Sequence, residues 1–173
     1  INGSDTVSLG IALTTTGTYN EGIKTTGGTN KVTVSEAGSI TTGTGAYYAF
    51  GIYNNGSTNT TTVSGSITTA GYNADGIYNE GAFNTTTVSG SIKIEGNSHG
   101  ITIYGDNNTT TVSGSIKTEG AGAHGIYNTG DTNTNTISGT VKATGASSAA
   151  LYNITGDGNS FTLNEGATII GDI

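Results

Sequence analysis

The sequence predicts an all-β chain folded as a parallel β-helix, with three short strands in each coil of about 25 residues and about six coils. The main observation is that three short β-type segments recur in a fixed order, each bounded by Gly, Asn, Asp or Ser. The chain also lacks proline, which fits because interior strands need every backbone N–H for pairing. A β-propeller is excluded because one blade needs about 40 residues.

The first repeated segment has a Ser-Gly pair followed two residues later by an aliphatic residue, as in VSGSI over 63–67. Its last residues are separated by 24 to 28 residues along the chain: Ile40, Ile67, Ile92, Ile116, Val141 and Ile169. This interval is the expected length of one coil, and successive coils should stack about 4.8 Å apart.

The second repeated segment reads Gly-Ile-Tyr-Asn at 51–54, 76–79 and 125–128, with degenerate copies at 100–103 and 150–153. Alternation along a strand turns its aliphatic residue inward, which applies to Ile52, Ile77, Ile101, Ile126 and Leu151. The next residues then form an outward column of Tyr53, Tyr78, Tyr127 and Tyr152, broken at Thr102. Tyrosine is enriched at interfaces, so this column is the predicted contact surface, unless the rings only cover a strand.

The third repeated segment reads Asn-Thr-Thr-Thr-Val, as at 59–63. Its aliphatic residue and the residue two positions earlier should face inward, which includes Val63, Val88, Val112, Ile137, Thr61, Thr86, Thr110 and Asn135. The alternate threonines should face solvent: Thr60, Thr62, Thr85, Thr87, Thr109 and Thr111. The leading asparagines should form a stacked structural ladder at one corner: Asn59, Asn84, Asn108, Asn133 and Asn159.

Composition excludes several classes of protein. The chain has no Cys, so it has no disulfide, thiolate metal site or cysteine nucleophile. All five basic residues are Lys and the net charge is −7, which argues against nucleic acid as a partner. No run of about 18 apolar residues occurs, so this segment should not insert directly into a membrane.

The words GSI, GIYN and NTTTVSG in a Cys-free chain rich in Thr, Asn and Gly resemble the passenger domains of bacterial autotransporters, the type V secretion family. The resemblance implies a right-handed β-helix that is extracellular, on or released from the bacterial cell surface. The array runs from about residue 7, and residues 1–173 form a single unit. Because the sequence shows neither the signal peptide nor the translocator barrel of the family, we expect it to be a segment of a longer passenger.

The sequence gives no sign of an enzyme. Serines are everywhere without a nucleophile elbow, and the acids lie mostly at turns or are isolated. Pectate lyases on β-helices commonly use Arg together with Ca²⁺-binding carboxylates, and this chain has no Arg. We therefore expect no catalytic residues and no cofactor, with Ca²⁺ as one open candidate.

Two groups of residues are candidate metal ligands. His99 and His124 precede the Gly-Ile pair in successive coils, in the place that Asp75 takes in another coil. They either bind a transition metal or occupy a variable, exposed turn position. Asp106, Asp131 and Asp157 also share one place in consecutive coils. They either bind Ca²⁺ or accept hydrogen bonds from turn N–H groups.

These observations favour a non-enzymatic β-helix at the cell surface, acting as an adhesin, a stalk or a self-associating structural element. Its partner would be a glycan or protein of a host or neighbouring cell, or identical subunits. Two alternatives stay open. One is an extracellular filament subunit that pairs through its open coil ends. The other is an ice-binding protein that uses the outward T-x-T ladder, although Lys31 interrupts that ladder.

Overall fold

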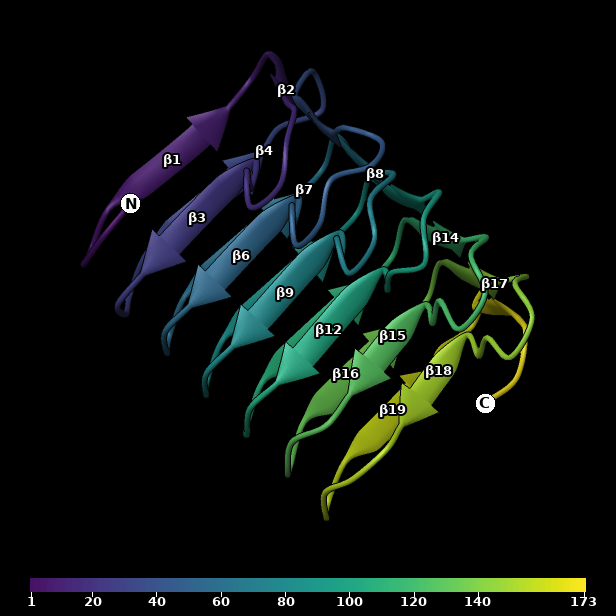
Figure 1. Cartoon of the computed structure of the whole chain (residues 1–173). Coiled ribbons are helices and arrows are strands. Elements are labelled where there is room, and N and C mark those ends of the chain that lie inside the picture. The colour runs from purple at the N-terminus through teal and green to yellow at the C-terminus, as the bar shows by residue number, and fades with distance from the viewer.

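The computed structural model describes all 173 residues, which form 20 strands and no helix. The strands make three parallel sheets along a rod, and the two chain termini lie at opposite ends of the stack (Figure 1). The predicted parallel β-helix is thereby confirmed. It has seven coils where about six were expected, because a first coil begins at Thr6, ahead of the clear repeats. No helix is present that could span a membrane.

Each sheet collects one of the three repeated segments. The first sheet contains β1 (Thr6–Leu9), β4 (Lys31–Val34), β7 (Thr60–Val63), β10 (Thr85–Val88), β13 (Thr109–Val112), β16 (Thr134–Ile137) and β19 (Ser160–Leu163). The second contains β2 (Ala12–Thr15), β5 (Ser39–Thr42), β8 (Ser66–Thr69), β11 (Ser91–Ile94), β14 (Ser115–Thr118), β17 (Thr140–Ala143) and β20 (Thr168–Ile170). The third contains β3 (Ile23–Thr26), β6 (Ile52–Asn55), β9 (Ile77–Glu80), β12 (Ile101–Tyr104), β15 (Ile126–Asn128) and β18 (Leu151–Asn153).

The repeats are in register, so equivalent residues of successive coils lie side by side. Thr85 pairs with Thr60 on one side and Thr109 on the other, and Val88 pairs with Val63 and Val112. A repeated side chain therefore becomes a continuous column along the rod. Any residue that departs from the repeat interrupts one column at a defined coil.

The core lies inside the triangle of sheets and follows the predicted alternation. Ile77 and Val88 are fully buried, and each belongs to a cluster of aliphatic side chains that runs the length of the rod. The predicted inward threonines are buried too, including Thr61 and Thr86. Burial of these residues stabilises the stack by about 25 cal/mol per Å² of apolar surface removed from water.

Two repeated glycines are required by close packing between coils. A Cβ on Gly76 would lie 2.5 Å from Ile92 Cγ2 and 2.7 Å from the Gly100 carbonyl oxygen, so no larger residue fits before the buried Ile77. A Cβ on Gly90 would collide with the Gly65 carbonyl oxygen of the neighbouring coil. These contacts explain why Gly-Ile and Ser-Gly recur in every clear copy.

The interior also holds a polar column that the sequence analysis missed. The asparagine of Gly-Ile-Tyr-Asn points inward, and Asn54 Nδ2 donates to Asn79 Oδ1 at 2.7 Å and to Thr61 Oγ1 at 2.9 Å. Asn79 Nδ2 donates in the same way to Thr86 Oγ1 at 3.0 Å. Alternation from the inward isoleucine could have located this column, because the asparagine stands two residues farther along the strand.

Candidate functional site

The outward side of the first sheet is an even hydroxyl surface, which we call the threonine face. Its two columns carry Thr or Ser at every position except Lys31, and include Thr60, Thr62, Thr85, Thr87, Thr109, Thr111, Thr134 and Thr136. The first column is exposed, and the second is half-buried except at its two ends, Ser8 and Thr162, which are exposed. Strand geometry sets the hydroxyl spacing at about 4.8 Å between coils and about 6.7 Å along a strand.

The predicted asparagine residues form a hydrogen-bonded ladder at the corner between the third and first sheets. Each side-chain oxygen accepts the backbone N–H of the asparagine in the preceding coil: Asn59 N to Asn84 Oδ1 at 2.8 Å, Asn84 N to Asn108 Oδ1 at 2.8 Å, Asn108 N to Asn133 Oδ1 at 2.7 Å, and Asn133 N to Asn159 Oδ1 at 2.8 Å. Most of these asparagines are buried, so the ladder satisfies backbone donors that water cannot reach.

The three aspartates of the calcium hypothesis lie in exposed turns at this same corner, and the same kind of bond engages two of them. Asp131 N donates to Asp106 Oδ1 at 2.8 Å, and Asp157 N donates to Asp131 Oδ1 at 2.9 Å. Nowhere in the chain do three or more His, Asp or Glu side chains gather as a metal-binding group. The carboxylates thus act as hydrogen-bond acceptors for turn N–H groups, and calcium binding stays a hypothesis.

Two neighbouring columns form the third face of the rod. The tyrosine column follows the outward positions of the third sheet: Lys24, Tyr53, Tyr78, Thr102, Tyr127 and Tyr152. The turn column consists of the residues that precede the Gly-Ile or Ala-Leu pair of each coil: Glu21, Phe50, Asp75, His99, His124 and Ala149. The turn column is mostly buried, so the expectation of an exposed turn position was wrong.

Four side chains of the turn column contact the tyrosine column of the following coil. Phe50 packs on Tyr78 with ring centroids 4.8 Å apart, His99 stacks on Tyr127 at 4.4 Å, and His124 stacks on Tyr152 at 4.1 Å. The tyrosines are therefore only half-exposed, because one side of each ring is covered. Between these ring pairs, the turn column carries Asp75 and the tyrosine column carries Thr102. Thr102 Oγ1 donates to Asp75 Oδ2 at 2.6 Å, so a hydrogen-bonded polar pair takes the place of a ring pair.

The turn column also caps backbone donors of the following coil. His99 N donates to Asp75 Oδ1 at 2.7 Å, His124 N donates to His99 Nδ1 at 3.0 Å, and Ala149 N donates to His124 Nδ1 at 2.9 Å. An Nδ1 that accepts a hydrogen bond carries no proton, so both imidazoles are neutral with the proton on Nε2. Metal coordination needs a free lone pair on a ring nitrogen. In both histidines the Nδ1 lone pair accepts a backbone N–H and Nε2 carries the proton, so neither nitrogen is free to bind a metal.

Burial shifts the proton affinity of this column. It lowers the pKa of His99 to about 4, and burial together with the nearby His99 lowers the pKa of His124 to about 4. Burial raises the pKa of Asp75 to about 6, against the opposing effect of the hydrogen bonds from Thr102 and His99. The column therefore holds neutral histidines beside a carboxyl group whose pKa lies closer to neutrality than usual but which is still ionised at pH 7.

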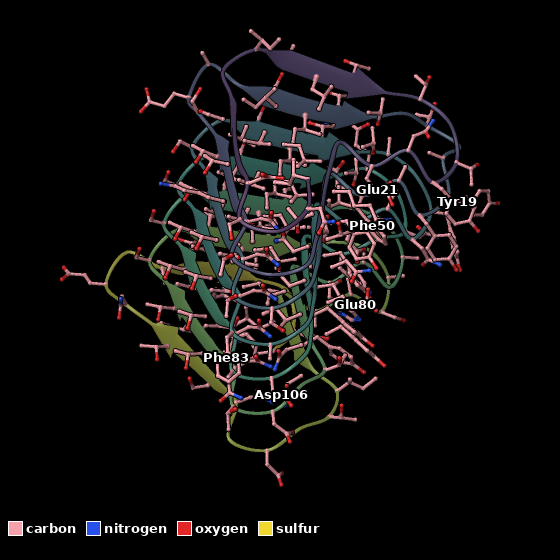
Figure 2. The ribbon with its side chains drawn as sticks, turned by 90° about the vertical axis from the view of Figure 1, so that its left-hand side faces the viewer. Tyr19, Glu21, Phe50, Glu80, Phe83 and Asp106 are labelled. Atoms are coloured by element: carbon pink, nitrogen blue, oxygen red, sulfur yellow. The ribbon has the colours of Figure 1, made fainter.

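A cluster of rings, the aromatic patch, lies beside these columns over the first three coils, and its one buried ring is Phe50. It comprises Tyr19, Tyr47, Tyr48, Phe50, Tyr53, Tyr72 and Tyr78. Tyr19 and Tyr48 stack at 5.5 Å, and Tyr47 and Tyr72 pack at 5.7 Å. Figure 2 shows Tyr19, Glu21, Phe50 and Glu80 along one edge of the rod, whereas Phe83 and Asp106 lie away from that edge.

Only the strand tyrosines of this patch were predicted from the repeated words. Tyr19, Tyr47, Tyr48 and Tyr72 come from the connections between the second and third sheets, at 16–22, 43–51 and 70–76, outside the repeated words. The signal that could have found them is the crowding of tyrosines into these three connections, compared with none at 95–100, 119–125 and 144–150.

A hollow of about 330 Å³ opens within the aromatic patch. Aromatic rings line it together with Glu21, Lys24 and Glu80. The Lys24 ammonium lies 4.8 Å from the centroid of the Tyr53 ring and 3.6 Å from Glu21 Oε1, and the Tyr53 hydroxyl donates to Glu80. We call it the lysine hollow. Its combination of rings and carboxylates is suited to hold a cation.

No protein-family model, curated protein or solved structure matches this chain.

Proposed function

We propose that this protein is a non-enzymatic β-helix of the bacterial cell surface that acts by contact, as an adhesin or a self-associating element. The rod supplies a rigid support, because every coil is paired to its neighbours through backbone hydrogen bonds. The aromatic patch supplies the contact. Its partner is a protein or glycan of another cell, or an identical subunit.

The main support for a contact role is that exposed aromatic rings are concentrated on a surface that elsewhere repeats small polar residues. Tyr19, Tyr47 and Tyr72 are each more than half exposed, and Tyr48 is 42% exposed. Clustered exposed aromatic side chains that have no role in the core are typical of binding surfaces. The absence of Cys and the resemblance of the repeats to autotransporter passengers support the extracellular location.

Attachment of protein-coated beads to cultured epithelial cells tests this proposal. The double variant Tyr19→Ser and Tyr48→Ser removes the stacked pair from the patch, and Tyr104→Ser, at a tyrosine that is 57% exposed outside the patch, is the matched control. We expect the wild type and the control to attach and the double variant to lose attachment. Equal attachment of all three, or none by the wild type, would refute a contact role of the patch towards cells.

The same beads distinguish contact between cells from self-association. Beads that clump with each other through the patch, and stop clumping when the pair is removed, would identify identical subunits as the partner. This measurement also covers the filament alternative, because filament growth through open coil ends would persist in the double variant.

A second candidate function is ice binding, which the regularity of the threonine face favours. Flat, in-register hydroxyl columns interrupted only at Lys31 present an ordered lattice to water. The test is thermal hysteresis of freezing at micromolar protein, with Thr85→Tyr and Thr87→Tyr as disrupting variants. Hysteresis that these variants remove would replace the contact proposal, whereas its absence leaves the threonine face as a strand surface.

A further inference from the structure

The tyrosine column is broken at Thr102, and the break leaves a second hollow of about 160 Å³. Its lining residues are Tyr48, Phe50, Asn73, Asp75, Tyr78, His99 and Thr102. We call it the Thr102 hollow. It adjoins the lysine hollow, since Tyr48, Phe50 and Tyr78 line both. At about 160 Å³ it is smaller than the 300–1,000 Å³ that drug-sized ligands occupy, so it suits a single small group.

Asp75 gives this hollow a buried carboxylate without a counter-charge. The residue is 5% exposed, and its oxygens accept hydrogen bonds from Thr102 Oγ1 and His99 N. None of the three ion pairs of the chain includes Asp75. The titratable residues that line the hollow with it are Tyr48, Tyr78 and His99, and hydrogen bonding holds His99 neutral. Buried carboxylates are ordinarily paired with a cation, and here no side chain of the chain supplies one.

The lysine hollow shows how this surface accommodates a cation. There Lys24 extends across the Tyr53 ring and reaches Glu21, which occupies the same turn column as Asp75. The Thr102 hollow offers the same two elements, aromatic walls and a turn-column carboxylate, but no lysine. The ammonium of an alkyl chain is the group that both elements attract.

We propose that the Thr102 hollow binds the side-chain ammonium of a lysine on a partner protein. The inference rests on the proposed contact function and names the chemistry of its partner. The net charge of −7 attracts cationic surfaces and repels anionic ones. The aliphatic stem of the lysine packs against Phe50 and Tyr78 while its ammonium reaches Asp75, as amphipathic side chains do elsewhere.

NMR titration of the labelled chain with n-butylammonium chloride, a mimic of the lysine side chain, tests the proposal. We expect saturable shifts of the Asp75, Tyr78 and Thr102 amides that weaken as salt is raised. Asp75→Asn keeps an oxygen acceptor for His99 N but removes the charge, and should weaken binding by about tenfold or more. Asp131→Asn, at an exposed acid on another corner, should bind as the wild type does.

A filling variant gives independent evidence. Thr102→Tyr restores the ring missing from the column and should block binding while the chain remains folded. Equal affinity of the wild type and Asp75→Asn for n-butylammonium would overturn the proposal. Tighter binding of tetramethylammonium would assign the hollow to quaternary headgroups instead of lysine. Equal shifts with uncharged n-butanol or a methyl glucoside would assign it to neutral ligands.

The two proposals fail separately. Beads that attach to cells although n-butylammonium does not bind would refute lysine recognition and leave the contact function standing. A chain that binds n-butylammonium at Asp75 while coated beads attach nowhere would refute the contact function alone.

Discussion

The threonine face and the aromatic patch are built on the same coils and differ in how they treat the repeat. Across the threonine face, every coil carries Thr or Ser at both outward positions except at Lys31. Over the aromatic patch, neighbouring coils carry different residues, and rings, carboxylates and a lysine contact one another. Uniformity on one face is what parallel pairing of a repeated strand produces. Positions that depart from the repeat are those where different side chains contact one another.

The largest difference in stability is expected between a substitution on the buried side of a strand and one on the threonine face of the same strand. Val88→Asp places a charge with no partner in the core and should abolish cooperative unfolding. Thr85→Asp, on the outward side of the same strand β10, should change the stability by less than about 1 kcal/mol. Thermal melts followed by circular dichroism measure both, and an unchanged midpoint for Val88→Asp would contradict the assignment of the two sides.

The turn column next to the aromatic patch should make stability depend on pH in two opposing ways. The pKa of His99 falls from 6.5 unfolded to about 4 folded, so the unfolded chain binds protons first and stability falls as pH drops from 6.5 towards 4. The pKa of Asp75 rises from 3.8 to about 6, so the folded chain binds a proton first and stability is gained as pH drops from 6 towards 3.8.

Asp75→Asn should therefore lose more stability between pH 6.5 and 4 than the wild type does, by up to about 3 kcal/mol. His99→Asn, which puts an amide oxygen near the place of Nδ1, should lose less. Urea unfolding at a series of pH values measures both slopes. Parallel curves for the three proteins would show that neither group is linked to folding. No comparable dependence is expected from the threonine face, which carries no titratable group except Lys31.

The asparagine ladder runs along the corner between the third and first sheets, next to the threonine face, whereas the aromatic patch lies at the corner between the second and third sheets. Asn84→Ala removes the acceptor of the buried Asn59 N–H and should destabilise the fold by about 1–3 kcal/mol. Asn97→Ala, at an exposed asparagine whose side chain makes no hydrogen bond, is the control and should be neutral. Denaturant midpoints compare the two, and equal effects would deny the ladder a role in stability.

The smallest expected effect compares one side chain of the tyrosine column with one of the threonine face. Tyr127→Ala removes the ring that stacks on His99 and should cost about 1 kcal/mol. Thr136→Ala on the threonine face should cost less than about 0.5 kcal/mol. If the threonine proved the more costly loss in thermal melts, the threonine face would be the more specialised surface and the comparison would be reversed.

The repeat pattern alone was enough to predict the coil, its period and the buried side of each strand. This was possible because in-register pairing converts a linear repeat into a column, and alternation assigns the faces, as for Ile77 and Val88. The same logic located the asparagine ladder and the break at Thr102. It miscounted the coils, because the first one carries only degenerate copies of the repeated words.

Where a residue departs from the repeat, its surroundings depend on which side chains the folded chain brings next to it. The turn column is buried because the tyrosines of the following coil pack over it. These contacts join residues more than 25 positions apart, so neither the alternation along a strand nor the turn signals predict them. The connections set Tyr19, Tyr47, Tyr48 and Tyr72 into one patch in the same way. Non-glycine residues such as Phe83 and Thr132 take left-handed backbone (φ of 60° and 54°), which stacking of the corner imposes against their intrinsic preference. Periodicity fixes a repeated residue, whereas a unique one is placed by the neighbours that the fold brings to it.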